Sequence, residues 1–164
     1  MQKLIKDNAI TENQWQLALA PEEGFVATEP TLLPIEFVKN ANLELPNPNI
    51  GLLIQSGDDI SEAKELINSV DVVALYFKNF MDGRSFSQAR IIREQFGYGG
   101  ELRASGFFIR DQLLYLKRCG VNAFDFSENA LEPEQAKDSL DDFTNFYQAG
   151  VDQPQPLYRR RLES

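Results

Sequence analysis

The chain of 164 residues contains no histidine and a single cysteine, Cys119. Zinc, iron–sulfur and haem sites are built mainly from His and Cys ligands, and Ser-His and Cys-His nucleophiles need an imidazole. The sequence therefore excludes these sites in the chain acting alone, together with an internal disulfide. We expect no metal site, and because no glycine-rich loop leads from a strand into a helix, we expect no nucleotide cofactor either.

Long apolar runs and excess basic charge are also missing. The longest apolar run covers residues 72–77, far short of the roughly 20 residues that span a bilayer. No apolar stretch develops before Asp7, so we expect no signal peptide. The net charge of −9 disfavours binding to nucleic acid or anionic membranes. These features predict a cytoplasmic protein without nucleic-acid or membrane partners.

The length fits a single domain, residues 1–164, in which we distinguish three parts. Residues 1–49 contain short apolar stretches broken by five prolines, which predicts a β-rich N-terminal extension. Asp7 and Asn8 tolerate positive φ and are expected at the tip of a hairpin. Residues 50–150 form the core, and residues 151–164 form a basic tail.

The core shows a repeated alternation of strand and helix signals. Strands are expected at residues 50–55, 72–77, 102–105 and 121–126, with 72–77 as the central strand. Helices are expected after Asp59 as an N-cap, after a Ser85/Gln88 capping box, over residues 108–119, and from Pro133 to Gly150 with Phe143 and Tyr147 on its buried side. About four βα units therefore predict an α/β fold with a parallel sheet, either open or shaped like a half-barrel.

Six of the nine arginines fall between residues 84 and 118, a segment with a net charge of +4 in an otherwise acidic chain. The loops 79–85 and 105–108 should lie side by side at the carboxyl ends of the strands, where helix N-termini and the guanidinium groups of Arg84 and Arg110 favour an anion. The candidate anion-binding residues are Asp82, Gly83, Arg84, Ser87, Arg90, Gly106, Arg110 and Asp111.

A purely structural alternative exists for each arginine. Asp82 can pair with Arg84, Glu94 with Arg90, and loop carbonyls with Arg110. The structural interpretation is favoured for Arg90, Arg93 and Arg118, whereas both alternatives remain open for Arg84 and Arg110. For Cys119, at a helix C-terminus, we expect buried packing rather than reactivity.

The basic tail contains Arg159, Arg160 and Arg161 after two prolines. It is most simply a solvated tail. It can also dock on the acidic last helix of the core or on an acidic partner, and we therefore treat the three arginines as candidate partner-binding residues.

The residues from Phe80 to Ala104, followed by Ile109-Arg-Asp-Gln-Leu113 and Arg118-Cys-Gly-Val-Asn-Ala-Phe124, resemble a bacterial family of unknown function, DUF934. Its members carry the description "probable oxidoreductase involved in sulfite reduction". The match is densest over residues 71–126, and the hallmark residues map to Asp82, Gly83, Arg84, Ser87, Arg90, Arg93, Gly97, Arg103, Gly106, Arg110, Asp111, Gln112, Arg118, Cys119 and Gly120. This chain departs from the family at Phe107, where the family often has a carboxylate, so an acid–base role for that loop is not supported.

The resemblance implies an accessory protein of assimilatory sulfite reduction that acts beside sulfite reductase, or another protein of sulfate assimilation, without a metal centre of its own. An alternative is a small enzyme or sensor that binds a sulfur oxyanion or a phosphorylated metabolite at the loops of Arg84 and Arg110. A third alternative is a purely structural homodimeric module.

Overall fold

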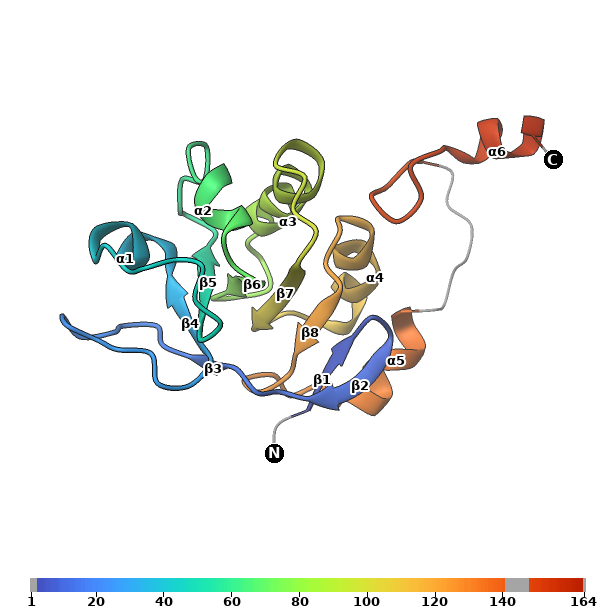
Figure 1. Ribbon diagram of the computed structural model, residues 1–164. Coiled ribbons are helices and arrows are strands. Elements are labelled where there is room, and N and C mark those ends of the chain that lie inside the picture. Colours follow the sequence, from blue (N-terminus) through green and yellow to red (C-terminus); the bar gives the residue numbers. More distant parts are fainter. Residues whose placement is uncertain (1–2, 141–147, 164) are drawn as a thin grey trace.

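The computed structural model describes residues 3–140 and 148–163 (Figure 1). Its elements follow in the order β1 (Lys3–Lys6), β2 (Ala9–Glu12), β3 (Gln16–Leu17), β4 (Thr31–Pro34), α1 (Ile35–Asn40), β5 (Ile50–Gln55), α2 (Lys64–Asn68), β6 (Val72–Phe77), α3 (Arg84–Arg90), the π-helical segment η1 (Ile91–Gln95), β7 (Glu101–Gly106), α4 (Arg110–Arg118), β8 (Ala123–Asp125), α5 (Pro133–Leu140) and α6 (Leu157–Glu163). No helix among these residues is long and apolar enough to cross a bilayer.

The eight strands form one mixed sheet in the order β2-β1-β8-β7-β6-β5-β4-β3, curled into a half-barrel (Figure 1). Strands β3 to β8 run parallel, whereas β1 is antiparallel to both β8 and β2. The α/β prediction is thus confirmed, and of its two alternatives the half-barrel applies. We expected a parallel sheet of about four βα units. The observed sheet is larger, because the N-terminal residues add four strands, and it is mixed, because β1 and β2 are antiparallel to their neighbours.

Those four strands lie at both edges of the sheet. The hairpin predicted at Asp7 and Asn8 is confirmed, since both residues have positive φ and the hairpin pairs with β8. Strands β3 and β4 instead pair with β5 at the opposite edge. Only residues 13–15, which we call the strap, connect β2 to β3, and such a connection reaches about 14 Å at most. The two edges must therefore approach each other, which accounts for the curl.

The sheet separates two sets of side chains. On the outer face, residues such as Leu75, Leu102 and Phe124 join Ile92 and Leu116 from the helical segments in the main core. On the inner face, a smaller cluster contains Leu32, Leu53, Val72, Ala74 and Tyr76, with Trp15 of the strap packed against it. Strand β6 is buried along its whole length, as predicted for the central strand.

Several helix boundaries differ from the predictions. Asp59 accepts a hydrogen bond from the N–H of Ser61 in a turn, and α2 begins only at Lys64. The predicted Ser85/Gln88 capping box is wrong, because α3 already begins at Arg84. Ser85 and Gln88 are therefore residues within the helix, and both are buried. Gln88 instead donates to the carbonyls of Gln55 and Asp58 in the loop after β5.

The C-terminal helices also differ from what the sequence suggested. Helix α5 begins at Pro133, as predicted, but its described part ends at Leu140. The predicted positions of Phe143 and Tyr147 lie outside the described residues. The predicted tail forms helix α6, which stands apart from the sheet (Figure 1).

Gly51 allows the strap to pack against the inner face. A Cβ at this position would lie 2.6 Å from Leu32 Cδ2, 2.9 Å from the carbonyl oxygen of Val72 and 3.0 Å from Cζ3 of Trp15. The carbonyl oxygen belongs to a central strand and cannot move without disturbing the sheet. Any larger residue at position 51 must therefore displace the indole or distort the strand.

We expect Gly51→Ala to lower the free energy of unfolding by about 1–3 kcal/mol, the usual cost of overpacking a core. Urea denaturation followed by circular dichroism measures this change. Gly57→Ala is the matched control, because a Cβ there has no atom within 4 Å. We expect the control to stay within about 0.5 kcal/mol of wild type. Equal effects at both positions would contradict the packing of the strap described above.

Candidate functional site

The first group of predicted residues lies in the loop after β6 and in helix α3. The guanidinium of Arg84 donates to both carboxylate oxygens of Asp82, from Nε at 3.0 Å and from Nη2 at 2.7 Å. The Asp82 carboxylate also accepts from the hydroxyl of Ser56 at 2.5 Å. Hydrogen bonds from Arg84 and Ser56 hold the pKa of Asp82 well below its usual range. The structural alternative for Arg84 is thus present, and Asp82 occupies the position that an external anion would take.

The remaining residues of this group lie along α3. Gly83 precedes the helix, and Ser87 is exposed on its surface. Arg90 forms an ion pair with Glu94 one turn later, at 2.8 Å, as the structural interpretation predicted. Arg93 donates to the carbonyls of Tyr98, Gly100 and Gly120 and so ties η1 to two turns.

The second group lies at the junction of β7 and α4. Gly106 has a φ of +88°, and a Cβ there would lie 2.5 Å from the carbonyl oxygen of Phe77. The backbone conformation and the close contact therefore both require glycine at this position. Arg110 donates from Nε to the hydroxyl of Ser139 in α5. Asp111 is exposed in the first turn of α4. Arg84 and Arg110 therefore bind different parts of the fold, and a common anion between them stays a prediction.

One hallmark side chain does connect the two loops. The amide of Gln112 accepts from the N–H of Ile109 at 3.1 Å and donates to the carbonyl of Phe80 at 2.7 Å. In the two loops that this amide joins, four large apolar side chains are exposed to solvent. We call them the rim patch; they are Phe80, Met81, Phe107 and Ile109, exposed by 51%, 81%, 50% and 40%.

The inner face of the half-barrel carries a buried polar network that we did not predict from the sequence. Arg103 is 1% exposed and donates to Glu101 at 2.6 and 2.7 Å and to Asn13 of the strap at 2.8 Å. Lys6 of β1 forms an ion pair with the other oxygen of Glu101 at 2.9 Å. The Asn13 amide also donates to Asp125 of β8. The network links the strap to β1, β7 and β8.

A sequence signal for this network existed in strand β7. Glu101, Arg103 and Ser105 alternate there with apolar Leu102 and Ala104. Such alternation places the polar side chains on one face of a strand. The strand was predicted over residues 102–105 without use of this alternation, so Glu101, Arg103 and Ser105 were not singled out as a set.

A second polar row lies nearer the carboxyl ends of the strands. Tyr76 pairs with Ser105, and Asp125 follows the pair formed by Ala104 and Phe124, so their side chains are neighbours on the inner face. Burial and a hydrogen bond to Glu128 raise the pKa of Tyr76 to about 12. A cleft of about 440 Å³ opens here between the strap and residues 125–128.

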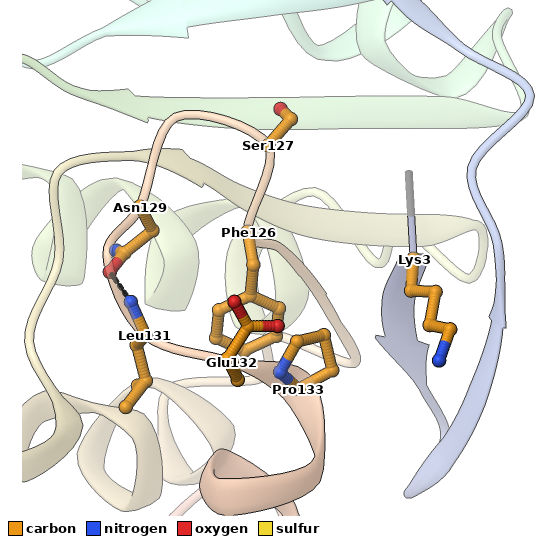
Figure 2. A pocket seen from close by; sticks show the side chains of 7 residues that line it. All are labelled: Lys3, Phe126, Ser127, Asn129, Leu131, Glu132 and Pro133. Carbon is orange, nitrogen blue, oxygen red and sulfur yellow. Dashed lines mark hydrogen bonds between the residues drawn. The ribbon is translucent and has the colours of Figure 1, made fainter. Parts of the chain in front are cut away.

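A second hollow of about 380 Å³ lies between β1 and the segment that joins β8 to α5 (Figure 2). Lys3 lines one side of it and forms an ion pair with Glu134 at 2.8 Å. On the other side, Asn129 accepts from the N–H of Leu131. Ser127 lines this hollow and the inner cleft, so the two lie next to each other.

The other predicted residues lie outside these two loops. Cys119 is buried, as predicted, and burial raises the pKa of its thiol. Arg159, Arg160 and Arg161 belong to α6, away from both loops (Figure 1). Within the described ranges, no group of three or more Cys, Asp or Glu side chains is arranged to hold a metal ion.

The comparisons with known proteins identify the family. The family model described as "Bacterial protein of unknown function (DUF934)" matches residues 51–158. This match covers more than half of the chain, and the chain therefore belongs to that family. No curated protein and no solved structure matches the chain significantly.

The ion pair between Asp82 and Arg84 should compete with the binding of an external anion to Arg84. Asp82→Asn removes the competing charge, and we expect it to raise the affinity for sulfate or sulfite about tenfold, the scale of one charge-assisted hydrogen bond. The double variant Asp82→Asn/Arg84→Ala should lose this gain in affinity. Arg110→Ala tests in the same way whether the second loop binds the anion. Isothermal calorimetry measures all of these affinities. If Asp82→Asn binds no more tightly than wild type, anions do not bind at Arg84.

The same pair predicts a pH dependence of stability. The pKa of Asp82 is lowered in the folded protein, so its contribution is complete well above pH 4, the ordinary pKa of Asp, and is lost as the pH falls further. The difference in urea midpoint between wild type and Asp82→Asn should therefore be larger at pH 7 than at pH 3. Asp138→Asn, at an exposed position in α5, is the control. A difference that grows toward pH 3 would rule out the pair as a source of stability.

Proposed function

We propose that this member of the DUF934 family works in the cytoplasm as an accessory protein of assimilatory sulfite reduction. It binds sulfite reductase, or another protein of sulfate assimilation, and contributes no metal centre of its own. The resemblance of the hallmark residues to proteins described as involved in sulfite reduction supports the pathway. The rim patch supports the mode of action, which is binding to a protein.

The rim patch is the observation that carries this proposal. Scattered exposed apolar side chains are normal, but Phe80 and Ile109 come from different loops and are held on the same amide of Gln112. Met81 directly follows Phe80 in the chain, and Phe107 lies two residues before Ile109, with the buried Phe108 between them. Exposed aromatic and Met side chains that lie on neighbouring, hydrogen-bonded loops are typical of the centre of a protein interface.

Charged residues beside the patch provide the polar surroundings of such an interface. The side chain of Arg84 is 67% exposed although it pairs with Asp82. Arg110 is also exposed, at the start of α4. The arginines of α6 offer a second contact on a separate arm (Figure 1). Exposed arginines steer association with an acidic partner, and this contribution weakens as salt is added.

The test is association with sulfite reductase from the same organism, measured by co-purification and by calorimetry at low ionic strength. The double variant Met81→Glu/Phe107→Glu places two charges in the rim patch and should weaken binding at least about tenfold. Val26→Glu is the matched control, because Val26 is 74% exposed in the loop between β3 and β4. Deletion of residues 157–164 should weaken binding mainly at low salt.

Two outcomes contradict the proposal. One is equal binding, or equal growth on sulfate as sole sulfur source, for wild type and the folded double variant. The other is a homodimer in sedimentation analysis that the double variant dissociates, which would assign the rim patch to a second copy of this chain. Circular dichroism of each variant shows whether its fold is retained.

A further inference from the structure

A groove of about 550 Å³ lies between helix α1 and the loop that joins β3 to β4; we call it the α1 groove. Phe25 of the loop, Phe37 of α1 and Leu43, just after α1, line it. Each of these side chains packs against the main core and is only partly buried there. The α1 groove therefore presents aromatic and aliphatic surface, and the residues of the rim patch do not line it.

The surroundings of the α1 groove are acidic. Over residues 18–49 the chain has five glutamates and one basic residue, Lys39, which pairs with Glu36. Glu23 lines the groove, and Glu22 and Glu44 are chain neighbours of lining residues; all three are exposed. Among the described residues, no lysine or arginine forms an ion pair with these three glutamates. Charge complementarity therefore favours an occupant that combines apolar and basic side chains.

Helix α6 has this combination. Arg159 and Leu162 are three residues apart, so they lie on the same side of the helix. Both are exposed, Leu162 by 84%. The helix has seven residues, and isolated helices shorter than about 12 residues are marginal in water, because most of their stability comes from packing an apolar face. The side of α6 that carries Leu162 therefore lacks the packing surface that such a short helix requires.

The groove and the helix lie at opposite ends of the molecule. Figure 1 shows α1 at one end and α6 beyond the other end. The chain ahead of α6 is held on α4, where the N–H of Val151 donates to the carbonyl of Arg118 at 2.8 Å. Asp152 also lies 3.5 Å from Nε of Arg118. In this arrangement α6 extends away from the groove of its own chain, so the helix that fills this groove comes from another copy.

We propose that α6 packs into the α1 groove of a second copy, so that two copies exchange their C-terminal helices in a reciprocal dimer. Leu162 of one copy contacts Phe25 and Phe37 of the other, and Arg159 pairs with Glu23. Two antiparallel copies related by a two-fold axis fill both grooves at once, which closes the assembly.

The dimer contact uses neither loop of the rim patch. Deletion of residues 157–164 affects both this dimer and the proposed binding of sulfite reductase, because both use α6. Substitutions in the α1 groove affect the dimer alone. They therefore separate a failure of this proposal from a failure of the proposed function.

Sedimentation velocity of the full chain over a range of concentrations tests the dimer. We expect a reversible dimer that Leu162→Glu weakens at least about tenfold, because it places a charge against the aromatic groove. Glu22→Lys/Glu23→Lys should weaken it by a similar factor, since each reversed charge acts at both contacts of the dimer. Adding Arg159→Glu to that double variant should restore part of the affinity. Asp138→Lys, an exposed charge reversal in α5, is the matched control and should change nothing.

Disulfide formation between two variants shows which segments meet. On mild oxidation, a mixture of Glu23→Cys and Leu162→Cys should give far more disulfide-linked dimer than either variant alone. The native Cys119 is buried and does not compete. The substituted side chains are exposed, so a failure to fold is not expected, and circular dichroism checks each variant.

Four results would overturn the proposal. The first is a monomer at every concentration. The second is a dimer that Asp138→Lys weakens as much as the reversal of Glu22 and Glu23. The third is a dimer that Met81→Glu/Phe107→Glu dissociates, which assigns the contact to the rim patch. The fourth is a mixture of the two cysteine variants that gives no more linked dimer than each variant alone.

Discussion

The inner face of the half-barrel depends on how one buried guanidinium is neutralised. Arg103 lies in the middle of the sheet, where an unpaired charge would cost several kcal/mol. Glu101, on the same strand, supplies the opposite charge, and Lys6 on β1 balances the second oxygen of that carboxylate. Asn13 supplies an acceptor from outside the strands. Satisfying Arg103 therefore requires the strap to cross the inner face, which brings the two edges of the sheet together.

This arrangement separates two surfaces with different chemistry. The inner face is partly covered by the strap and carries the buried network around Arg103. The rim patch is open and apolar and suits a protein. Several hallmark residues of the family belong to neither surface: Arg93, Gly106 and Gly120 maintain turns and close contacts between elements. These three residues therefore maintain the fold.

The sequence predicted best those elements whose signal is local. Strand β6 was predicted with its observed bounds because its six apolar residues are rich in β-branched and aromatic side chains, which favour a strand covered on both faces. Asp82 was foreseen as a partner of Arg84, two residues away. Ser56, 26 residues from Asp82, was not, because nothing in the local pattern indicates which loop will lie beside it. The strap was missed for the same reason, since Asn13 meets Arg103 across 90 residues. Ser85 and Gln88 fit a capping box locally, but burial against the loop after β5 determined their positions.

The pairing of β1 with β8 has a consequence for the order of events during synthesis. Leu4 pairs with Asp125, so the first hairpin emerges from the ribosome about 120 residues before its partner strand. At about 5–20 residues per second, the hairpin waits roughly 6–24 seconds with its inner side uncovered. The polar hairpin residues Lys3, Lys6 and Glu12 limit aggregation in this interval, because charged side chains on an edge strand oppose pairing with other chains. Strands β4 to β7 assemble meanwhile from neighbouring segments, and the half-barrel is completed only when β8 joins the two ends.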